Sequence, residues 1–327
     1  MPGAGAGAGA GGRPVPRRVT LLVNPAAGGR RGGGKAAAAA RRLLAHGVEV
    51  DVVAGRDAAE ARARARAAVS AGADVLAVAG GDGLVHLALQ EVAGTGTALA
   101  VLPSGTGNDF ARVLGIPRAD PAAAADVITG GVARTLDLGR ANAGDGGGPC
   151  WFGTVLTSGF DSLVTDRTNR MRWPRGRARY NLAVLAELGV LRPRPYLLEL
   201  DGERSELSAV LIAVGNTTTY GGGMRICPHA ATDDGRLAVT VVGPAGVARL
   251  VRAFPRLYRG THVSDPLVAT FHARRVRVHT EAMRAYADGE LVGALPVTAE
   301  AVPSAVRVLV PETAAGRGPG PVVGAGG

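Results

Sequence analysis

The sequence predicts an α/β protein in which an N-terminal, doubly wound parallel α/β domain precedes a C-terminal, mostly antiparallel β-rich domain. Three observations support this prediction. Strand and helix signals alternate through the first third of the 327 residues, three of the four strands expected there end in glycine-rich turns, and short β-type runs dominate after about Asp137. Such alternation is typical of parallel βα units, whereas short runs separated by Gly/Asp turns favour antiparallel sheets.

The first domain is expected to contain four strands, each followed by a helical pattern. The strands are predicted at 19–25, 48–53, 74–81 and 97–105, and the helices at 35–47, 57–72, 84–94 and 108–116. Gly47 ends the first helix, and Pro117 follows the last one. In an open parallel sheet the carboxyl ends of the strands share one edge, where ligands bind.

The second part contains alternating apolar runs that predict strands, and two helical patterns interrupt them. The strands are predicted at 151–159, 196–202, 208–216, 237–243, 267–273, 275–280 and 283–290, and the helices at 179–191 and 246–260. We place the domain boundary near residue 136, so that the domains span 17–136 and 137–302 and a segment at 303–313 returns to the first domain. The Gly/Ala/Pro-rich tails 1–16 and 314–327 are predicted to be disordered.

The charge of the chain favours polyanionic partners. The net charge is +10 and the pI is about 10.8, which suits nucleic acid, an anionic membrane or phosphorylated substrates. The arginines are spread too widely for a groove-reading helix, so no nucleic-acid partner is expected. No apolar stretch reaches the roughly 18 residues of a membrane span, and the N-terminus lacks the apolar core of a signal peptide.

The two cysteines, Cys150 and Cys227, do not form a disulfide framework, although a bridge between them remains open. Low cysteine usage fits a reducing compartment. We therefore expect a cytoplasmic protein that associates peripherally with a membrane. The sequence does not define the oligomeric state.

Three glycine-rich turns are predicted to share the sheet edge: "NPAAGG" (24–29), "GGDG" (80–83) and "PSGTGND" (103–109). Glycine lets the backbone approach an anion closely, and each following helix offers unpaired amides and a positive dipole end. Asn24, Asp82, Asn108 and Asp109 add polar groups within the turns. Together they predict a site for a nucleotide-sized polyanion; the alternative is three ordinary βα turns in a glycine-rich chain.

Other nucleotide and catalytic motifs are incomplete or absent. "GRRGGGKA" (29–36) has the spacing of a Walker A loop, but Ala36 replaces the hydroxyl residue that would hold Mg²⁺. "GTGNDF" lacks the last glycine of a dinucleotide fingerprint. The sequence contains no Cys/His cluster with zinc spacing and no G-x-S-x-G nucleophile elbow.

The ordered motifs resemble the diacylglycerol kinase catalytic-domain family, which includes bacterial lipid kinases and sphingosine kinases and is distantly similar to NAD kinases. The resemblance extends from Val19 to Pro311, and its most specific parts are "GTGNDFAR" and the late "DGE" at 288–290. The motifs that carry it are Asn24-Pro25 with Gly28, "GGDG", "PSGTGNDFAR", "NTTTYGGGMRICPHAATDDGRL" and "DGE".

The resemblance implies that ATP binds between the two domains and that its γ-phosphate passes to a lipid hydroxyl, with diacylglycerol as the expected acceptor and phosphatidic acid as the product. It makes the first domain nucleotide-binding and the second lipid-binding. The nucleotide-binding residues it implies are Asn24, Pro25, Gly28, Gly80, Gly81, Asp82, Gly83, Gly105, Thr106, Asn108 and Asp109.

The resemblance also implies catalytic and metal-binding roles. Asp288 would be the general base with Glu290 nearby, and Asp82 would help to organise Mg²⁺. Asp234 would bind a structural Mg²⁺ with the backbone carbonyls of Ala231 and Arg236, since hard cations prefer oxygen ligands. Read locally, "DDG" and "DGE" are equally consistent with hairpin turns.

Two departures leave other functions open. Family members usually carry Thr after "GGDG" and an Asn-Glu pair soon afterwards, but this chain has Leu84-Val85-His86-Leu87. A phosphate contact and a polar partner on the helix are therefore missing. The alternatives are a kinase of another acceptor (a sphingoid base, another lipid or NAD) and a non-catalytic nucleotide- or lipid-binding protein.

A basic segment at 167–180, "RTNRMRWPRGRARY", interleaves six arginines with Met171, Trp173 and Tyr180. Basic residues beside interfacial aromatics suit an anionic membrane surface. We expect this segment to dock the protein on lipid; the alternative is a solvated loop.

Overall fold

The computed structural model describes residues 16, 18–23, 32–144, 148–159 and 192–315, with positions 163, 164, 167, 168, 171 and 173. The predicted turn 24–29, the predicted helix 179–191 and most of the basic segment 167–180 lie outside the described residues, as do nearly all of the two tails.

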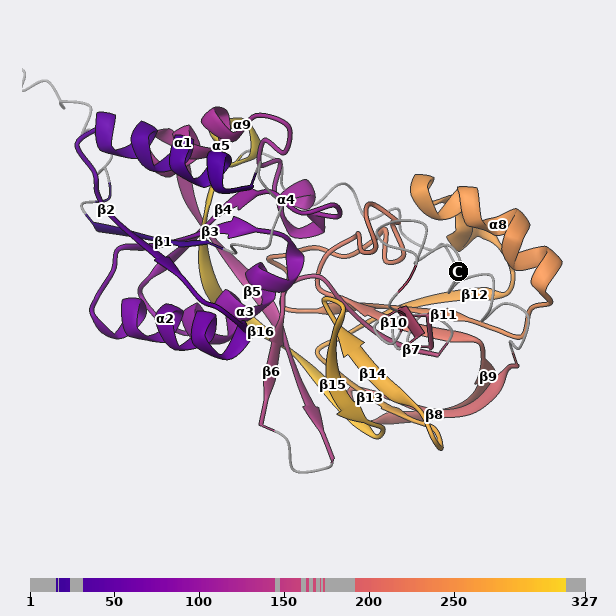
Figure 1. The fold of residues 1–327 in the computed structure, drawn as a ribbon. Helices are drawn as coiled ribbons and strands as arrows, with labels where there is room; N and C mark the ends of the chain where they lie inside the picture. Colours follow the sequence, from indigo (N-terminus) through magenta and orange to yellow (C-terminus); the bar gives the residue numbers. More distant parts are fainter. Residues whose placement is uncertain are drawn as a thin grey trace, which may run out of the picture.

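The N-terminal part is a parallel sheet with helices on both faces, as predicted. Its strands lie in the order β2-β1-β3-β4, with α1 and α5 on one face and α2 and α3 on the other (Figure 1). The strands are β1 Arg18–Val23, β2 Glu49–Ala54, β3 Val75–Gly80 and β4 Ala98–Pro103; the helices are α1 Gly32–Ala45, α2 Ala58–Ser70, α3 Asp82–Val92, α4 Asp109–Val113 and α5 Pro121–Gly130.

Helix α5 is not among the helices predicted from the sequence, although its start carries a clear signal. The Asp120 carboxylate accepts the amides of Ala122 and Ala123 at 2.9 and 3.1 Å, and Pro121 occupies the first helical position. An Asp cap followed by proline is a typical helix start. The short alanine-rich run offered too little hydrophobic periodicity to reveal the helix.

The C-terminal part is a sandwich of two largely antiparallel sheets. One sheet has the order β12-β11-β10-β7-β14-β15, and the other continues the parallel sheet as β4-β16-β13-β8-β9, with β5 beside β16 and β6. The strands are β5 Val132–Ala143, β6 Cys150–Phe152, β7 Val155–Gly159, β8 Arg194–Leu200, β9 Glu203–Ala209, β10 Leu211–Gly215, β11 Leu237–Val242, β12 Val268–Ala273, β13 Arg275–His279, β14 Arg284–Ala287, β15 Glu290–Ala294 and β16 Val297–Val310; the helices are α8 Val247–Arg259, the 3-10 helix Thr261–Ser264 and α9 Glu312–Ala315.

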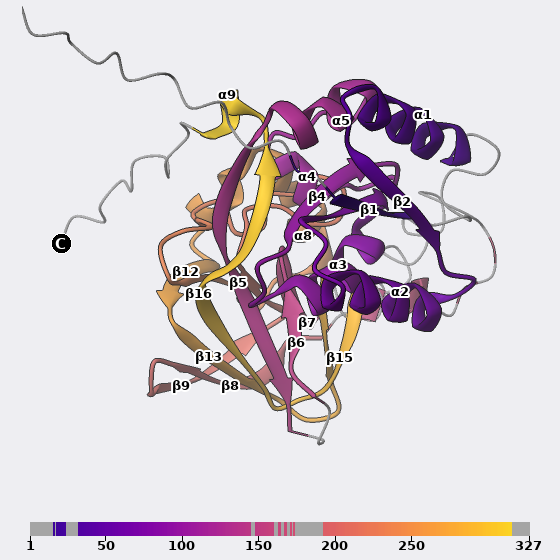
Figure 2. The same ribbon diagram turned by 90° about the vertical axis from the view of Figure 1, so that its left-hand side faces the viewer.

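A long antiparallel ribbon of β5 and β16 belongs to both parts (Figure 2). It is paired from Val132↔Val310 to Ala143↔Val297, with an irregularity between Val302 and Val306. At one end β16 also pairs in parallel with β4, and at the other it pairs with β13. The expected boundary near residue 136 falls inside β5, which is continuous there, and the segment 303–313 includes the second half of β16.

Asp137 holds the irregular part of this ribbon. Its buried carboxylate accepts the amide of Ser304 at 2.8 Å through Oδ1 and the amide of Gly235 at 2.7 Å through Oδ2. Ser304 has a φ of 53°, so the bulge is held in a conformation that non-glycine residues rarely adopt. One side chain therefore connects β5, β16 and the loop before β11.

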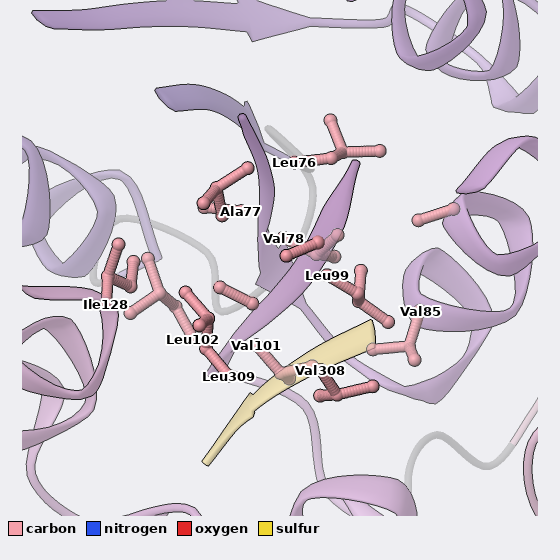
Figure 3. Close-up of a cluster of buried hydrophobic side chains, with 14 of the residues drawn as sticks. Leu76, Ala77, Val78, Val85, Leu99, Val101, Leu102, Ile128, Val308 and Leu309 are labelled. Atoms are coloured by element: carbon pink, nitrogen blue, oxygen red, sulfur yellow. The ribbon is translucent and has the colours of Figure 1, made fainter. Parts of the chain in front are cut away.

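Two main cores stabilise the fold. In the first, Leu76 and Val78 of β3, Leu99 of β4 and Val85 of α3 belong to one buried cluster with Val308 of β16, so the returning strand completes the α/β core (Figure 3). The second lies between the two sheets of the sandwich and includes residues of β7, β10, β11, β13 and β16. The predicted fold class, a doubly wound α/β domain followed by an antiparallel β-rich domain, is confirmed.

Two further expectations concern the cysteines and membrane spans. Cys150 and Cys227 are both free thiols, so the bridge that the sequence left open is not formed; burial raises the pKa of Cys227 to about 12. Among the described residues, no helix combines the length and the apolar character needed to cross a bilayer.

We predict that Asp137→Asn lowers the free energy of unfolding by about 1–3 kcal/mol, because the new amide NH₂ would face a backbone N–H in place of an acceptor. Urea denaturation followed by circular dichroism measures this change. Asp51→Asn, at an exposed position of β2, is the matched control and should leave stability unchanged. Equal stabilities of the two variants would contradict the role given to Asp137.

Candidate active site

The glycine-rich turns after β3 and β4 meet at one sheet edge. Gly80 pairs with Pro103 at the ends of these strands, and the Ser104 amide donates to the Gly80 carbonyl at 2.9 Å. A Cβ atom built on Gly105 would lie 2.5 Å from the Cα of Gly81, so the two backbones touch. Only glycine allows this approach, which explains why both turns are glycine-rich. The first predicted turn, with Asn24, Pro25 and Gly28, lies outside the described residues.

Asp82 fixes the shape of the second turn. Its carboxylate accepts the amides of Asn108 and Asp109, both at 2.7 Å, and Gly107 leaves room for it, since a Cβ there would lie 2.6 Å from Oδ2. Asn108 adopts a φ of 53° and hydrogen-bonds the backbone of Gly105 through both ends of its side-chain amide. Burial, aided by the charge of Asp109, raises the pKa of Asp82. Both Asp82 oxygens are thus used within the protein.

Asp109 links this turn to the second part of the chain. Its Oδ2 accepts the amide of Gly222 at 2.7 Å, and Arg112 packs over the neighbouring Gly223. Burial raises the pKa of Asp109 although the Gly222 amide and the Arg112 charge oppose the shift. The "NTTTYGGG" motif therefore contacts "GTGNDFAR" directly. Thr106, in the turn after β4, is exposed.

Leu84 is a core residue. It is 9% exposed, and a Cβ on Gly80 would lie 2.7 Å from its Cδ2 atom, so its side chain covers the end of β3. Leu84 therefore fills space under the first turn of α3. The hydroxyl expected at this position is replaced by apolar packing.

Asp288 lies at the junction between the two parts, in the turn between β14 and β15. Its side chain is 4% exposed and its φ is 54°. Oδ1 accepts the amide and the hydroxyl of Thr154 at 2.7 and 2.5 Å, and Oδ2 accepts the amide of Gly153 at 2.9 Å. His86 Nδ1 donates to the same Oδ2 at 3.1 Å.

His86 forms a buried ion pair with Asp288 that the sequence analysis did not anticipate. Burial disfavours its charge, but the hydrogen bonds to Asp288 and Cys150 outweigh this effect and raise the pKa of His86 to about 10. Burial likewise opposes ionisation of Asp288, yet His86 and Thr154 hold the pKa of the carboxyl below its ordinary value. The available signal was a histidine within the apolar run of α3.

Two amide side chains, Gln90 and Asn216, connect the elements around this pair. Gln90 of α3 accepts the Trp151 amide at 2.9 Å and donates to the Trp151 carbonyl at 2.8 Å, which ties α3 to β6. Asn216 donates to the carbonyls of Asp137 and Gly153 at 3.0 and 3.1 Å. The ribbon, the turn at Gly153 and Asp288 are therefore connected through continuous hydrogen bonds.

Glu290 differs from Asp288 in its surroundings. It is exposed at the start of β15, and a Cβ on Gly83 would lie 3.2 Å from its Oε1. Its carboxylate therefore lies against the "GGDG" turn and is open to solvent. The structure brings together Gly80, Gly81, Asp82, Gly83, Gly105, Thr106, Asn108, Asp109, Asp288 and Glu290.

The predicted metal residues are less closely assembled. Asp234 is exposed and accepts the amide of Arg236 at 3.0 Å in its own loop, which also holds Ala231. No group of three His, Cys, Asp or Glu side chains placed to hold a metal occurs in the part of the chain that the structure describes. Mg²⁺ in kinase sites is held by one or two carboxylates, waters and substrate phosphates. Because both Asp82 oxygens accept backbone amides, an ion that arrives with the nucleotide would be held chiefly by phosphates and waters.

Comparison with known protein families matches both parts of the chain. The diacylglycerol kinase catalytic domain matches residues 18–141, and the YegS C-terminal NAD kinase beta sandwich-like domain matches residues 154–310. Together these matches span the site from "GGDG" to "DGE".

Individual relatives cover nearly the whole chain. A protein of Mycobacterium tuberculosis (strain ATCC 25618 / H37Rv) named diacylglycerol kinase is 46% identical over 295 residues, which covers 90% of this chain and 95% of the relative. A diacylglycerol kinase of Bacillus subtilis (strain 168) is 29% identical over 284 residues, covering 86% and 92%. A crystal structure of a diacylglycerol kinase from Bacillus anthracis str. Sterne shares the fold, with a TM-score of 0.70 and 22% identity over 92% of this chain and all of that one.

We predict that Gly105→Ala weakens nucleotide binding at least about tenfold, because the added methyl group separates the two turns. Isothermal titration with an ATP analogue measures the affinity. The control is Gly96→Ala, just before β4, where an added Cβ would meet nothing within 4 Å. Equal affinities of the two variants would show that the turns need not touch.

The His86–Asp288 pair predicts a pH-dependent stability. The pKa of His86 rises on folding from 6.5 to about 10. Its contribution to the free energy of unfolding is therefore complete below about pH 6.5 and is lost as the pH rises through about 10. The pKa of the Asp288 carboxyl is lowered on folding. The stability that Asp288 contributes is therefore lost only when the pH falls below the ordinary pKa of an aspartate.

The stability lost in His86→Gln should therefore be largest near about pH 6 and should shrink toward about pH 10. Urea denaturation across this range measures the difference. His229→Gln, at an exposed loop position, is the control. A difference between wild type and His86→Gln that stays constant with pH would contradict the ion pair.

Proposed function

This chain belongs to the diacylglycerol kinase family and is a lipid kinase, and from that premise we propose that it transfers the γ-phosphate of ATP to the hydroxyl of diacylglycerol, forming phosphatidic acid. The observation that supports this proposal best is the β14–β15 turn, which carries one buried and one exposed carboxylate against the "GGDG" turn. The relatives named above support the acceptor.

The paired glycine-rich turns suit the phosphates of ATP. The first amides of α3 have no partner within the helix, and the positive end of the helix dipole faces the same edge. The close contact of Gly81 with Gly105 presents backbone rather than side chains there. Mg²⁺ bound with ATP would neutralise phosphate charge and would be held mainly by the phosphates and water, which leaves the Glu290 carboxylate free.

We assign the general base to Glu290 rather than to Asp288. The Asp288 oxygens already accept four hydrogen bonds, and its side chain is almost fully buried. Glu290 is open and lies beside Gly83, and this proposal puts the phosphate of the nucleotide at that turn. The sequence-based assignment of the base to Asp288 thus becomes a positioning role in this proposal.

The reaction then proceeds as an in-line transfer. The diacylglycerol oxygen attacks the γ-phosphorus, the bond from that phosphorus to the bridging oxygen of ADP breaks, and the hydroxyl proton passes to Glu290. Asp288, held by His86 and Thr154, fixes the turn that carries Glu290. The link from Asp109 to Gly222 keeps the nucleotide edge in register with the second domain.

Radiolabelled ATP with a panel of acceptors tests the function. We expect phosphate transfer to diacylglycerol in preference to a sphingoid base, monoacylglycerol or NAD. Preferential transfer to another member of the panel would overturn the acceptor. Binding of ATP without transfer to any acceptor would overturn the kinase activity and favour a nucleotide-binding protein.

We predict that Glu290→Gln lowers kcat by about 10²-fold or more while ATP affinity and the free energy of unfolding stay unchanged. Asp288→Asn should lower both activity and stability, because the partner of a buried cation is lost. Glu203→Gln, at an exposed position of β9, is the control. A nearly active Glu290→Gln enzyme together with a stable, inactive Asp288→Asn enzyme would return the base role to Asp288.

A further inference from the structure

Helix α8 carries an apolar stripe that no described residue covers. Val247, Val251, Phe254 and Tyr258 recur at spacings of four, three and four, so they share one face of the helix. Their exposed fractions are 43, 53, 38 and 44%. The rings of Phe254 and Tyr258 meet edge to face with centroids 5.8 Å apart, which gives the stripe a continuous aromatic end.

A different face of α8 attaches it to the protein. Leu250 and Leu257 pack against the buried cluster that contains Val155, Leu211 and Ile226. None of the α8 residues is fully buried, and in Figure 1 the helix lies at the outer edge of the second domain, away from the parallel sheet. The stripe is therefore not needed to hold the helix in place.

The charge of α8 is entirely positive. The helix contains four arginines and no acidic residue. Arg249 pairs with Asp265 at 2.7 Å, and Arg256 donates to the Thr261 carbonyl and to the Ser264 hydroxyl. Arg252 and Arg259 are exposed, and no ion pair of either occurs among the described residues. At about 100° per residue, Arg252 and Arg259 fall on the flank of α8 about 120° from the centre of the apolar stripe, on the side away from Leu250 and Leu257.

This combination selects one kind of partner. A second copy of the chain packed on the stripe would bring the arginines of two α8 helices together, and like charges at an interface oppose association. A bilayer with anionic headgroups accepts aliphatic and aromatic side chains at its interface and attracts the flanking arginines. Arg252 and Arg259 have the donors and the charge to bind lipid phosphates.

We propose that α8 docks this protein on an anionic membrane surface, with Val247, Val251, Phe254 and Tyr258 inserted at the interface and Arg252 and Arg259 against lipid phosphates. The proposal rests on the lipid-kinase function, because a diacylglycerol acceptor resides in a bilayer. It adds a described docking element to the predicted basic segment 167–180, of which Trp173 is 80% exposed.

Vesicle flotation tests this proposal without ATP or diacylglycerol. Wild-type protein should float with vesicles of phosphatidylglycerol and phosphatidylcholine and not with phosphatidylcholine alone. Val251→Asp/Phe254→Asp should reduce the bound fraction at least about tenfold. The matched control is Leu44→Asp/Val52→Asp, which changes the charge equally at side chains that are 57 and 53% exposed on the first domain; it should bind as wild type does.

A second pair of variants tests the charge. Arg252→Gln/Arg259→Gln should lower binding to the anionic vesicles, whereas Arg41→Gln/Arg277→Gln, with the same loss of charge at exposed positions elsewhere, should not. Circular dichroism verifies that every variant is folded. Kinase activity of the α8 variants on a water-dispersed short-chain diacylglycerol should remain at the wild-type level.

The proposal is overturned if wild type fails to bind anionic vesicles, if the α8 variants bind like wild type, or if the control pairs lose binding equally. It is also overturned if light scattering shows a wild-type dimer that Val251→Asp/Phe254→Asp converts to a monomer, because a second copy would then be the occupant. Failure of the proposed function has a different signature: vesicles bind normally, but no acceptor is phosphorylated.

Discussion

The β5–β16 ribbon determines how the two halves of this molecule meet. Because its two strands run from the α/β core into the sandwich without interruption, the domains share a continuous sheet instead of a flexible linker. Asp137 fixes the irregular middle of the ribbon through two backbone amides. Asn216 then connects the Asp137 carbonyl to Gly153, and Gly153 holds Asp288. The position of the β14–β15 turn, which carries Asp288 and Glu290, thus follows from the ribbon.

Buried carboxylates hold the loops of the site together, and the proposed mechanism leaves the reaction to an exposed one. Asp82, Asp109 and Asp288 each accept a hydrogen bond from a backbone amide. These buried carboxyl groups therefore hold loops in place. Burial raises the pKa of Asp82 and Asp109, whereas the His86 cation keeps the pKa of Asp288 low. Glu290 has no such role and retains free lone pairs. In the proposed mechanism, holding the shape of the site and accepting the proton therefore fall to different carboxylates.

Local patterns predicted most of the fold, because strands and helices are encoded by periodicity and turn residues. The glycines after β3 and β4 also predicted that the two turns meet at one sheet edge, and their backbone contact leaves no room for side chains. The His86–Asp288 pair could not be read in this way: its members are separated by 202 positions, and only the ribbon brings them together. The sequence motif indicates only that Leu84 replaces a hydroxyl residue. The structure shows that Leu84 is buried among apolar side chains, and the motif alone does not predict that packing.

Helix α8 also divides its side chains between two roles: one face packs on the protein and another is exposed. Its Leu250 and Leu257 anchor it to the sandwich, so the outward stripe is free to interact without loosening the core. A lipid kinase that was held at a bilayer by charge alone would bind weakly in salt, because ions screen the attraction between charges over about 10 Å. An inserted aromatic and aliphatic stripe is insensitive to that screening. In the proposed docking, the arginines of α8 favour the approach to the membrane, and the apolar side chains prolong the contact once it is made.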